Sequence, residues 1–285
     1  MNITTLLNKV YFTPRLKKID LYANRAEELQ HQVLNRLVRM AENTEWGKTE
    51  WGLKYDYKSI HTYEDFRNRL PIQTYEEVKP YVERLRAGEQ NLLWSSEIRW
   101  FAKSSGTTND KSKFLPVSKE SLNDTHYQGG KDAVTLYLAQ NPDSRFFSGQ
   151  GLILGGSHSP NLNSRHGLVG DLSAILIQNI HPLVNCVRVP SKKIALMSDF
   201  EKKIEAIANS AVSKNVTSLS GVPSWMLVLI KRILEKTGKE SLEEIWPNLE
   251  VFFHGGVAFT PYREQYKEVI RSSKMHYVET YNASE

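Results

Sequence analysis

The sequence has one cysteine, no long apolar run and no block of five or more like charges. A single thiol, Cys186, forms neither an internal disulfide nor a thiolate zinc site, so the simplest reading is a reducing, cytoplasmic setting. Because Cys186 lies in the apolar stretch HPLVNCVRVP, we expect its side chain to be buried. The longest apolar run, WMLVLI at 225–230, is too short for a membrane span, and the N-terminus lacks the apolar region of a signal peptide. We therefore expect no membrane partner.

The excess of one sign of charge is also small, because the chain has 37 basic and 32 acidic residues and a net charge of +5. This mild excess suits an anionic ligand, but without a basic tail we expect no nucleic-acid partner. The sequence contains no H-E-x-x-H, no G-x-S-x-G and no pair of carboxylates at glycosidase-like positions. The composition is that of an ordinary globular protein with a sizeable core.

Strand-like and helix-like segments alternate along the chain, which indicates an α/β fold with mostly parallel sheets. Helices are expected over 20–43, 121–140 and 199–213 and after 223, with an amphipathic region over 62–87 broken by Pro71 and Pro80. Strands are expected in EIRWFAK, KFLPVS, GQGLIL, SLSG, LEVFF and KMHYVETY, whereas LSAILIQNI fits either helix or strand. No linker is evident, so we expect one undivided domain.

The segment SSGTTNDKSK, 104–113, is dense in hydroxyls, backbone amides and lysines. It is not a Walker loop, because the second glycine is absent, the lysine comes one residue early and no helix follows. Small polar residues around a glycine let backbone N–H groups converge on an anion, and lysines add charge. From the residues alone, an anion-binding loop and a solvated hairpin loop are equally good readings.

The same segment resembles the phosphate loop of the adenylate-forming superfamily. Its Ser-Ser-Gly-Thr-Thr form is similar to that of the acyl acid–amido synthetases, the auxin-responsive promoter family of plants and its bacterial relatives. Further stretches follow in that family's order from about residue 25: AENTEWGKTEWG, YEDFRNRLPIQTYEEVKPYVERLRAGEQNLLW, SGVPSWM, VFFHGGVAFTPY and YNASE. The chain is thus similar to the N-terminal part of a bacterial-type member.

The resemblance implies the large N-terminal domain of an acyl-CoA synthetase/luciferase-like enzyme, an α/β domain that is incomplete here. Residues 1–285 would form part of that domain, and the C-terminal lid domain would be absent from the chain. We accordingly expect these residues alone to be inactive. The full-length protein is expected to be a monomer or a homodimer.

The resemblance also assigns roles to individual residues, with ATP and Mg²⁺ as cofactors. Two lysines would act on the phosphates during catalysis: Lys111 and Lys113. The nucleotide would be bound by Ser104, Ser105, Gly106, Thr107, Thr108, Gly255, Gly256, Tyr281 and Ser284. Tyr281 would stack on adenine, Ser284 would contact the α-phosphate, and Glu285 would ligate the metal with a hard carboxylate oxygen.

The pocket for the acyl substrate would be lined by Tyr127, Val222, Pro223 and Ser224. Without the resemblance, the HGG stretch would be read as a tight turn and YNASE as a terminal turn. The helix from 121 would be read as packing in the core. His254 is expected to be packed or hydrogen-bonded. One departure from the family is Asp110, where relatives usually have glycine.

The implied reaction joins a small carboxylic acid to an amino acid in two steps. The acid attacks the α-phosphorus of ATP, releasing pyrophosphate, and an amine then attacks the acyl carbon of the adenylate. No enzyme nucleophile is needed, which agrees with the missing nucleophile motifs. Two alternatives remain open: another adenylate-forming ligase, such as an acyl-CoA type, and a non-catalytic nucleotide-binding domain.

Overall fold

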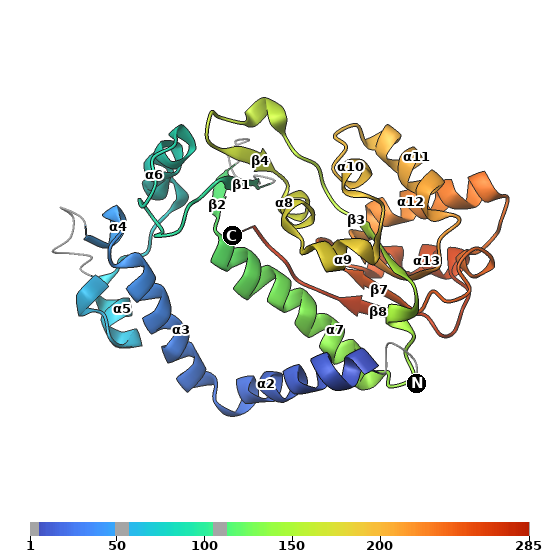
Figure 1. Ribbon diagram of the computed structural model, residues 1–285, viewed down its shortest axis with the longest axis horizontal. Helices are drawn as coiled ribbons and strands as arrows, with labels where there is room; N and C mark the ends of the chain where they lie inside the picture. Colours follow the sequence, from blue (N-terminus) through green and yellow to red (C-terminus); the bar gives the residue numbers. More distant parts are fainter. Residues whose placement is uncertain (1–5, 49–56, 105–112, 285) are drawn as a thin grey trace. The chain divides into compact units, whose positions relative to one another are not determined.

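A computed structural model describes residues 6–48, 57–104 and 113–284. The chain divides into two compact units, and each has its own sheet and apolar core (Figure 1). Unit 1 contains residues 1–16, 129–158 and 171–285, and unit 2 contains 17–128 and 159–170. Two boundaries fall inside or at the start of helices, α2 (Thr13–Asn24) and α7 (Gln128–Gln140). The chain passes between the units within these helices, so the division is not marked by a segment with the composition of a linker. The sequence had led us to expect one undivided domain.

Unit 1 is built on a parallel sheet of five strands in the order β5-β3-β6-β7-β8. The strands are β3 (Gln150–Leu154), β5 (Arg188–Val189), β6 (Val216–Gly221), β7 (Val251–His254) and β8 (His276–Glu279). The α/β class and the mostly parallel pairing expected from the sequence are confirmed.

Helices cover both faces of this sheet (Figure 1). The larger core packs one face against α11 (Phe200–Ala211), α12 (Pro223–Thr237) and α13 (Arg263–Val269). The smaller core packs Val251 and Phe253 of the other face against Tyr137 and Leu138 of α7. The residues at 172–180 form a helix, α8 (Leu172–Asn179), followed by the short α9 (Pro182–Cys186) and α10 (Lys192–Ala195).

Unit 2 contains a three-stranded sheet in the order β2-β1-β4. β1 (Trp100–Lys103) pairs antiparallel with β2 (Phe114–Val117) and parallel with β4 (Leu168–Gly170). Phe101 and Val169 of this sheet pack against Val82 and Leu85 of α6 (Tyr75–Ala87) in the core of the unit.

The expected helix over 20–43 is divided at Arg25 into α2 and α3 (Ala26–Ala41). Much of the apolar surface of this helix stays in solvent, because α3 buries only Val38 and Ala41, and Val33 and Leu37 are exposed. Shorter helices are α4 (Glu45–Lys48) and α5 (Tyr63–Arg69), and single turns lie at Asn8–Phe12, Tyr57–Ser59, Phe146–Ser148, Pro160–Leu162, Leu242–Glu244 and Thr260–Tyr262.

Pro71 separates α5 from α6 as expected, but the break expected at Pro80 is wrong, because Pro80 lies inside α6. A capping box between Thr74 and Glu77 secures the first turn of that helix, and the helix continues through Pro80 without the one hydrogen bond that proline cannot donate. The helix after β2 begins as a π-helical turn, Ser121–Tyr127, and the Oγ of Ser118 accepts the Ser121 N–H at 3.0 Å.

The expectation that Cys186 is buried is also wrong, because its side chain is exposed. α9 lies at the surface with Leu183 and Val184 exposed as well, so an apolar stretch here does not mark the core. No described helix is both long enough and apolar enough to cross a membrane.

Candidate functional site at the carboxyl edge of the parallel sheet

Four strands of the parallel sheet end side by side. The register aligns Leu154, Gly221, His254 and Glu279 in one row across β3, β6, β7 and β8. The turns that follow these strands therefore emerge together at one edge. In open parallel sheets, ligands bind at the carboxyl ends of the strands, so this edge is the candidate site.

The turn after β7 brings backbone close to backbone. A side-chain carbon on Gly255 would overlap the carbonyl oxygen of Thr280, so only glycine fits there. Gly256 has φ +84°, a left-handed conformation that favours glycine. The two glycines predicted to bind the nucleotide thus form a turn without side chains, and a flat ring can approach such a turn closely.

The segment after β8 runs alongside this turn. Thr280 donates from its backbone N–H, at 2.7 Å, and from its hydroxyl, at 3.0 Å, to the carbonyl oxygen of His254. Tyr281 follows directly and is 93% exposed, which leaves its ring free to stack on a ligand. Ser284 is half-buried, and Glu285, the predicted magnesium ligand, lies outside the described residues.

His254 is packed rather than poised for catalysis, as expected. Its side chain is buried and stacks on Phe259 with ring centroids 4.3 Å apart. Burial lowers the pKa of His254, an effect that Glu279 opposes. The imidazole is therefore neutral near pH 7 and helps to hold the turn in place.

The turn between β6 and α12 carries three predicted acyl-binding residues. Pro223 is buried at the first position of α12, and its carbonyl oxygen accepts the Tyr266 hydroxyl at 2.8 Å. Val222 and Ser224, on either side, are half-buried. This turn directly adjoins the Gly255–Gly256 turn, since Val222 contacts the position that a Gly256 side chain would take.

The predicted phosphate loop connects the two strands of a hairpin in unit 2. The N–H of Ser104 donates to the carbonyl oxygen of Lys113 at 3.0 Å, one step beyond the last paired residues of β1 and β2. Ser104 is buried, whereas Lys113 is half-buried. The prediction that an extended strand, not a helix, follows this loop is confirmed.

Tyr75 of α6 holds the base of this hairpin. Its hydroxyl oxygen accepts the Phe114 N–H at 2.9 Å, and the ammonium of Lys113 lies 5.6 Å from the centroid of its ring. The remaining predicted residues of the loop lie outside the described part of the chain: Ser105, Gly106, Thr107, Thr108 and Lys111, with Asp110 beside them. The hairpin thus fixes both ends of the loop.

Tyr127 also belongs to unit 2, in the π-helical turn, and burial raises its pKa to about 12. The described site residues are therefore divided between the units. Ser104, Lys113 and Tyr127 lie in unit 2, and the residues of the β6, β7 and β8 turns lie in unit 1.

One turn of this edge carries no residue predicted from the sequence. Gly155 and Gly156 follow β3, next to the β6 turn, and their carbonyl oxygens both accept from the ammonium of Lys203. The Gly-Gly pair after a strand marks this turn in the sequence. The sequence motifs did not assign Lys203 to the site. The one sequence signal for it is its place in α11, directly before the buried Ile204.

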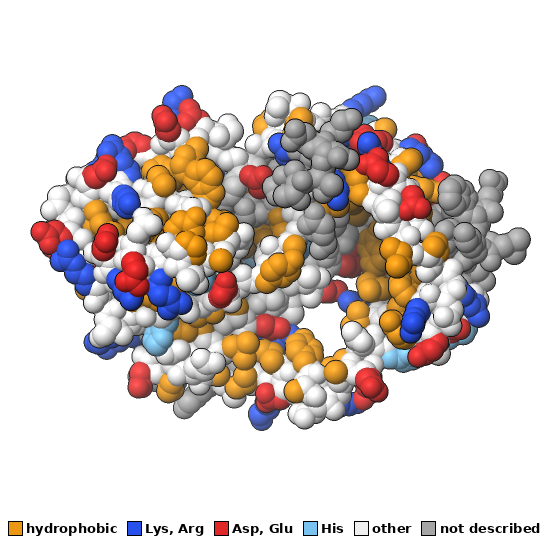
Figure 2. Space-filling view, turned by 180° about the vertical axis from the view of Figure 1, so that it is seen from behind, with side chains coloured by type: hydrophobic (Ala, Val, Ile, Leu, Met, Phe, Trp, Pro, Cys, Tyr) orange, Lys and Arg blue, Asp and Glu red, His pale blue; other side chains and the backbone are white. Residues whose placement is uncertain are grey.

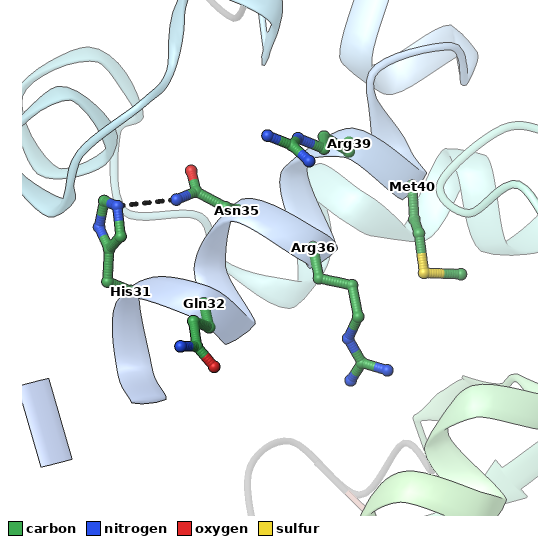
Figure 3. A pocket seen from close by; sticks show the side chains of 6 residues that line it. All are labelled: His31, Gln32, Asn35, Arg36, Arg39 and Met40. Atoms are coloured by element: carbon green, nitrogen blue, oxygen red, sulfur yellow. Dashed lines mark hydrogen bonds between the residues drawn. The ribbon is translucent and has the colours of Figure 1, made fainter. Parts of the chain in front are cut away.

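A separate hollow of about 450 Å³ lies along α3 in unit 2 and contains no predicted site residue (Figure 3). Within it, His31 and Asn35 are joined by a 2.9 Å hydrogen bond, and Arg36 forms an ion pair with Asp124 at 2.6 Å. Its lining side chains are His31, Gln32, Asn35, Arg36, Arg39 and Met40.

Acidic and basic side chains are interspersed over the face shown in Figure 2 instead of gathering by sign. In the described ranges, no three His, Cys, Asp or Glu side chains are placed to hold a metal ion together.

Comparison with solved structures defines the fold. The chain matches the AtGH3.15 acyl acid amido synthetase in complex with 2,4-DB with a TM-score of 0.67, at 17% identity, over 90% of this chain and 53% of that one. A second structure titled GH3.15 acyl acid amido synthetase gives a TM-score of 0.64 at 16% identity. The chain thus has the fold of the acyl acid amido synthetases and spans about half of their length.

Sequence comparison then identifies the family. The model of the GH3 family N-terminal domain matches residues 15–275, so the chain belongs to the GH3 family. Indole-3-acetic acid-amido synthetase GH3.2 of Arabidopsis thaliana is 30% identical over 108 residues, 38% of this chain and 19% of that protein. Jasmonoyl--L-amino acid synthetase JAR4 of Nicotiana attenuata is 28% identical over 111 residues, 39% of this chain and 18% of that protein. The resemblance drawn from the sequence motifs is confirmed.

Proposed function

We propose that this chain is the N-terminal part of an ATP-dependent acyl acid–amido synthetase. The observation that carries the proposal is the carboxyl edge of the parallel sheet in a GH3-family chain. There, a turn that admits only glycine lies beside an exposed tyrosine ring, an arrangement suited to a flat base. The substrates would be a small carboxylic acid and the amine of an amino acid.

The nucleotide would lie along the β7 and β8 turns. The Gly255–Gly256 turn would face adenine at close range, and the ring of Tyr281 would stack on the base. The hydroxyl of Ser284, three residues further along, would donate to the α-phosphate. This order places the base near the end of β7 and the phosphates beyond the end of β8.

The hairpin loop would hold the departing pyrophosphate. Its ends are fixed by the Ser104–Lys113 bond, and Lys113 would add positive charge together with Lys111. The first step mainly requires neutralisation of the charge that develops on the leaving group, and fixed donors stabilise that charge effectively. Mg²⁺ held by Glu285 would supply further neutralisation.

Within unit 1, Val222 and Ser224 of the β6 turn would contact the acyl group. Pro223 would contribute through the shape that it imposes on the start of α12, because it is buried. Tyr127, predicted from the family resemblance to contact the acyl group, would do so as a neutral phenol, because its pKa, raised by burial from 10 to about 12, lies far above neutral pH.

Pyrophosphate exchange tests the proposal. The purified full-length protein is incubated with ATP, Mg²⁺, labelled pyrophosphate and a panel of aryl and aliphatic carboxylic acids, and acid-dependent label in ATP is measured. We expect exchange with a subset of the acids and, when amino acids are added, an amide product. Thioester formation with coenzyme A instead would favour another adenylate-forming ligase. Nucleotide binding without exchange by the full-length protein would favour a non-catalytic domain.

A further inference from the structure

The turn that follows β3 depends on one buried lysine. The Nζ of Lys203, on α11, donates to the carbonyl oxygens of Gly155 and Gly156 at 2.8 Å each and lies 3.5 Å from the hydroxyl of Ser157. All of its partners therefore belong to three consecutive residues, 46 to 48 positions away in the sequence. Lys203 is 2% exposed, so water cannot replace these bonds.

Other side chains hold the remaining polar groups of the turn. The N–H of Gly156 donates to the Oγ of Ser173 at 2.7 Å, and the N–H of Ser157 donates to Asp171 Oδ2 at 2.8 Å. The Ser157 hydroxyl donates to the carbonyl oxygen of Met197 at 2.7 Å. The N–H groups of Gly156 and Ser157 are thus satisfied by α8 and its cap, and the Ser157 hydroxyl by Met197, while the two glycine carbonyls accept from Lys203.

The two titratable groups that face the ammonium are Asp171, at the start of α8, and His158, directly after the turn. Neither forms an ion pair with it. Charged groups on the other elements that pack against α11 are engaged elsewhere. Lys192 donates to Gln178 O, Lys193 is exposed, Arg188 donates to Pro190 O, and Arg232 and Lys236 pair with Glu205.

We propose that Lys203 is a positioning residue whose protonated side chain fixes the Gly155–Ser157 turn as the fourth turn of the carboxyl edge. The register places this turn directly beside the β6 turn, because Leu154 pairs with Gly221. The part of the proposal that concerns ATP binding rests on the proposed function. The part that concerns the turn does not.

The proposal predicts a change near neutral pH. Burial lowers the pKa of Lys203 to about 8, with Asp171 opposing the shift. When the ammonium loses its proton, the charge-assisted hydrogen bonds to the glycine carbonyls become weaker, neutral ones. Burial also lowers the pKa of His158, so that group titrates in a separate, more acidic range.

The test begins with an NMR titration of the ¹⁵N-labelled protein from pH 6.5 to 9.5. We expect the amide resonances of Gly155, Gly156 and Ser157 to shift with a common midpoint near pH 8. Lys203→Met should abolish this transition, whereas Lys202→Met, which removes the exposed neighbouring lysine of the same helix, should keep it. Turn amides that do not shift over the pH range in which the ¹³Cε resonance of Lys203 reports the loss of its proton would overturn the proposal, even if Lys203→Met failed to fold.

The second measurement is the affinity for ATP by calorimetry at the same pH values. We expect wild-type and Lys202→Met affinity to fall about threefold or more between pH 7 and 9.5. Lys203→Met should bind about tenfold more weakly at pH 7, without that pH dependence. Titrating amides with an unchanged ATP profile would refute the role in the site. If ATP did not bind at any pH, the proposed function would fail, and the NMR titration would still decide whether Lys203 fixes the turn.

Global stability separates positioning from general structural support. The folded pKa of Lys203 lies below the ordinary value of 10.5, so the unfolded chain binds the proton more tightly. This group alone therefore makes the free energy of unfolding rise as the pH increases from about 8 to 10.5. ATP affinity that falls while the wild-type protein gains stability relative to Lys203→Met supports positioning. A parallel loss of both would contradict it.

Discussion

At the scale of single residues, the exposed ring of Tyr281 carries the proposed recognition of adenine. Tyr281→Ala should weaken ATP binding by about 1–2 kcal/mol, the scale of aromatic stacking on a base, whereas Tyr281→Phe should retain most of the affinity. Tyr63→Ala, which removes a tyrosine that is 60% exposed on α5, is the matched control and should have no effect. Titration with ATP decides, and equal affinity for Tyr281→Ala and Tyr63→Ala would reject the stacking role.

Gly255 permits a second test at this scale. The new methyl group in Gly255→Ala would overlap Thr280 O, so the backbone must shift, and the free energy of unfolding should fall by about 1–3 kcal/mol. Gly130→Ala is the control, because nothing lies within 4 Å of that position in α7 and alanine favours a helix. Urea denaturation of both variants should give changes of opposite sign. A Gly255→Ala variant as stable as the wild type would show that the turn has more room than the structure indicates.

At the scale of elements, the β1–β2 hairpin should contribute to ATP binding through Lys113, the lysine at its base. Lys113→Ala removes a charge beside the proposed phosphate site, and ATP binding should weaken by about 1 kcal/mol or more. Lys119→Ala, which removes an exposed lysine just beyond β2, is the control. The affinity of each variant for ATP is measured at two salt concentrations. Unchanged binding by Lys113→Ala would remove this lysine from the site.

The stability of the start of α11, the helix that carries Lys203, should depend on pH through its N-cap residue, Asp199. Asp199 accepts the backbone N–H of Lys202 at 3.1 Å, and this bond is the main reason why its pKa lies below the ordinary 3.8. Because the folded pKa is lowered, the stability contributed by the carboxylate is present above pH 3.8 and is lost as the pH falls through the folded pKa. The two variants Asp199→Ala and Asp199→Asn separate charge from capping.

Thermal melts between pH 3 and 7 test this expectation. Asp199→Ala should be less stable than the wild type at pH 7, with a difference that shrinks toward pH 3. Asp199→Asn keeps an acceptor for the helix N-terminus but does not titrate, so its difference from Asp199→Ala should be constant. A pH-independent gap between the wild type and Asp199→Ala would contradict the assigned cause.

At the scale of the whole molecule, the two units have separate cores. Leu85 is fully buried in unit 2 and Leu229 in unit 1, and the two belong to different apolar clusters. Leu85→Ala should cost about 2–5 kcal/mol locally. Hydrogen exchange should then accelerate in β1 and β4 and remain slow in β6 and β7, with the reverse pattern for Leu229→Ala. Equal acceleration in both units would show that they unfold as one.

The sequence alone determined the features that are encoded within a few residues. The sequence predicted the helices at 199–213 and after 223, the Gly-Gly stretches predicted turns after strands, and the ordered motifs identified the family. Where local signals competed, they misled. Pro80 sits in a helix secured by its capping box, and the apolar stretch around Cys186 lies at the surface.

Tertiary structure decided which of these local features meet. The row of Leu154, Gly221, His254 and Glu279 depends on strand order, and strand order follows from how helices far apart in the sequence pack on the sheet. The contact of Lys203 with the β3 turn joins residues almost fifty positions apart, and no local pattern encodes its partners. The chemistry of each turn could be predicted because it is a property of neighbouring residues. Their convergence into one edge could not, because the free energy that selects it comes from burying the whole core.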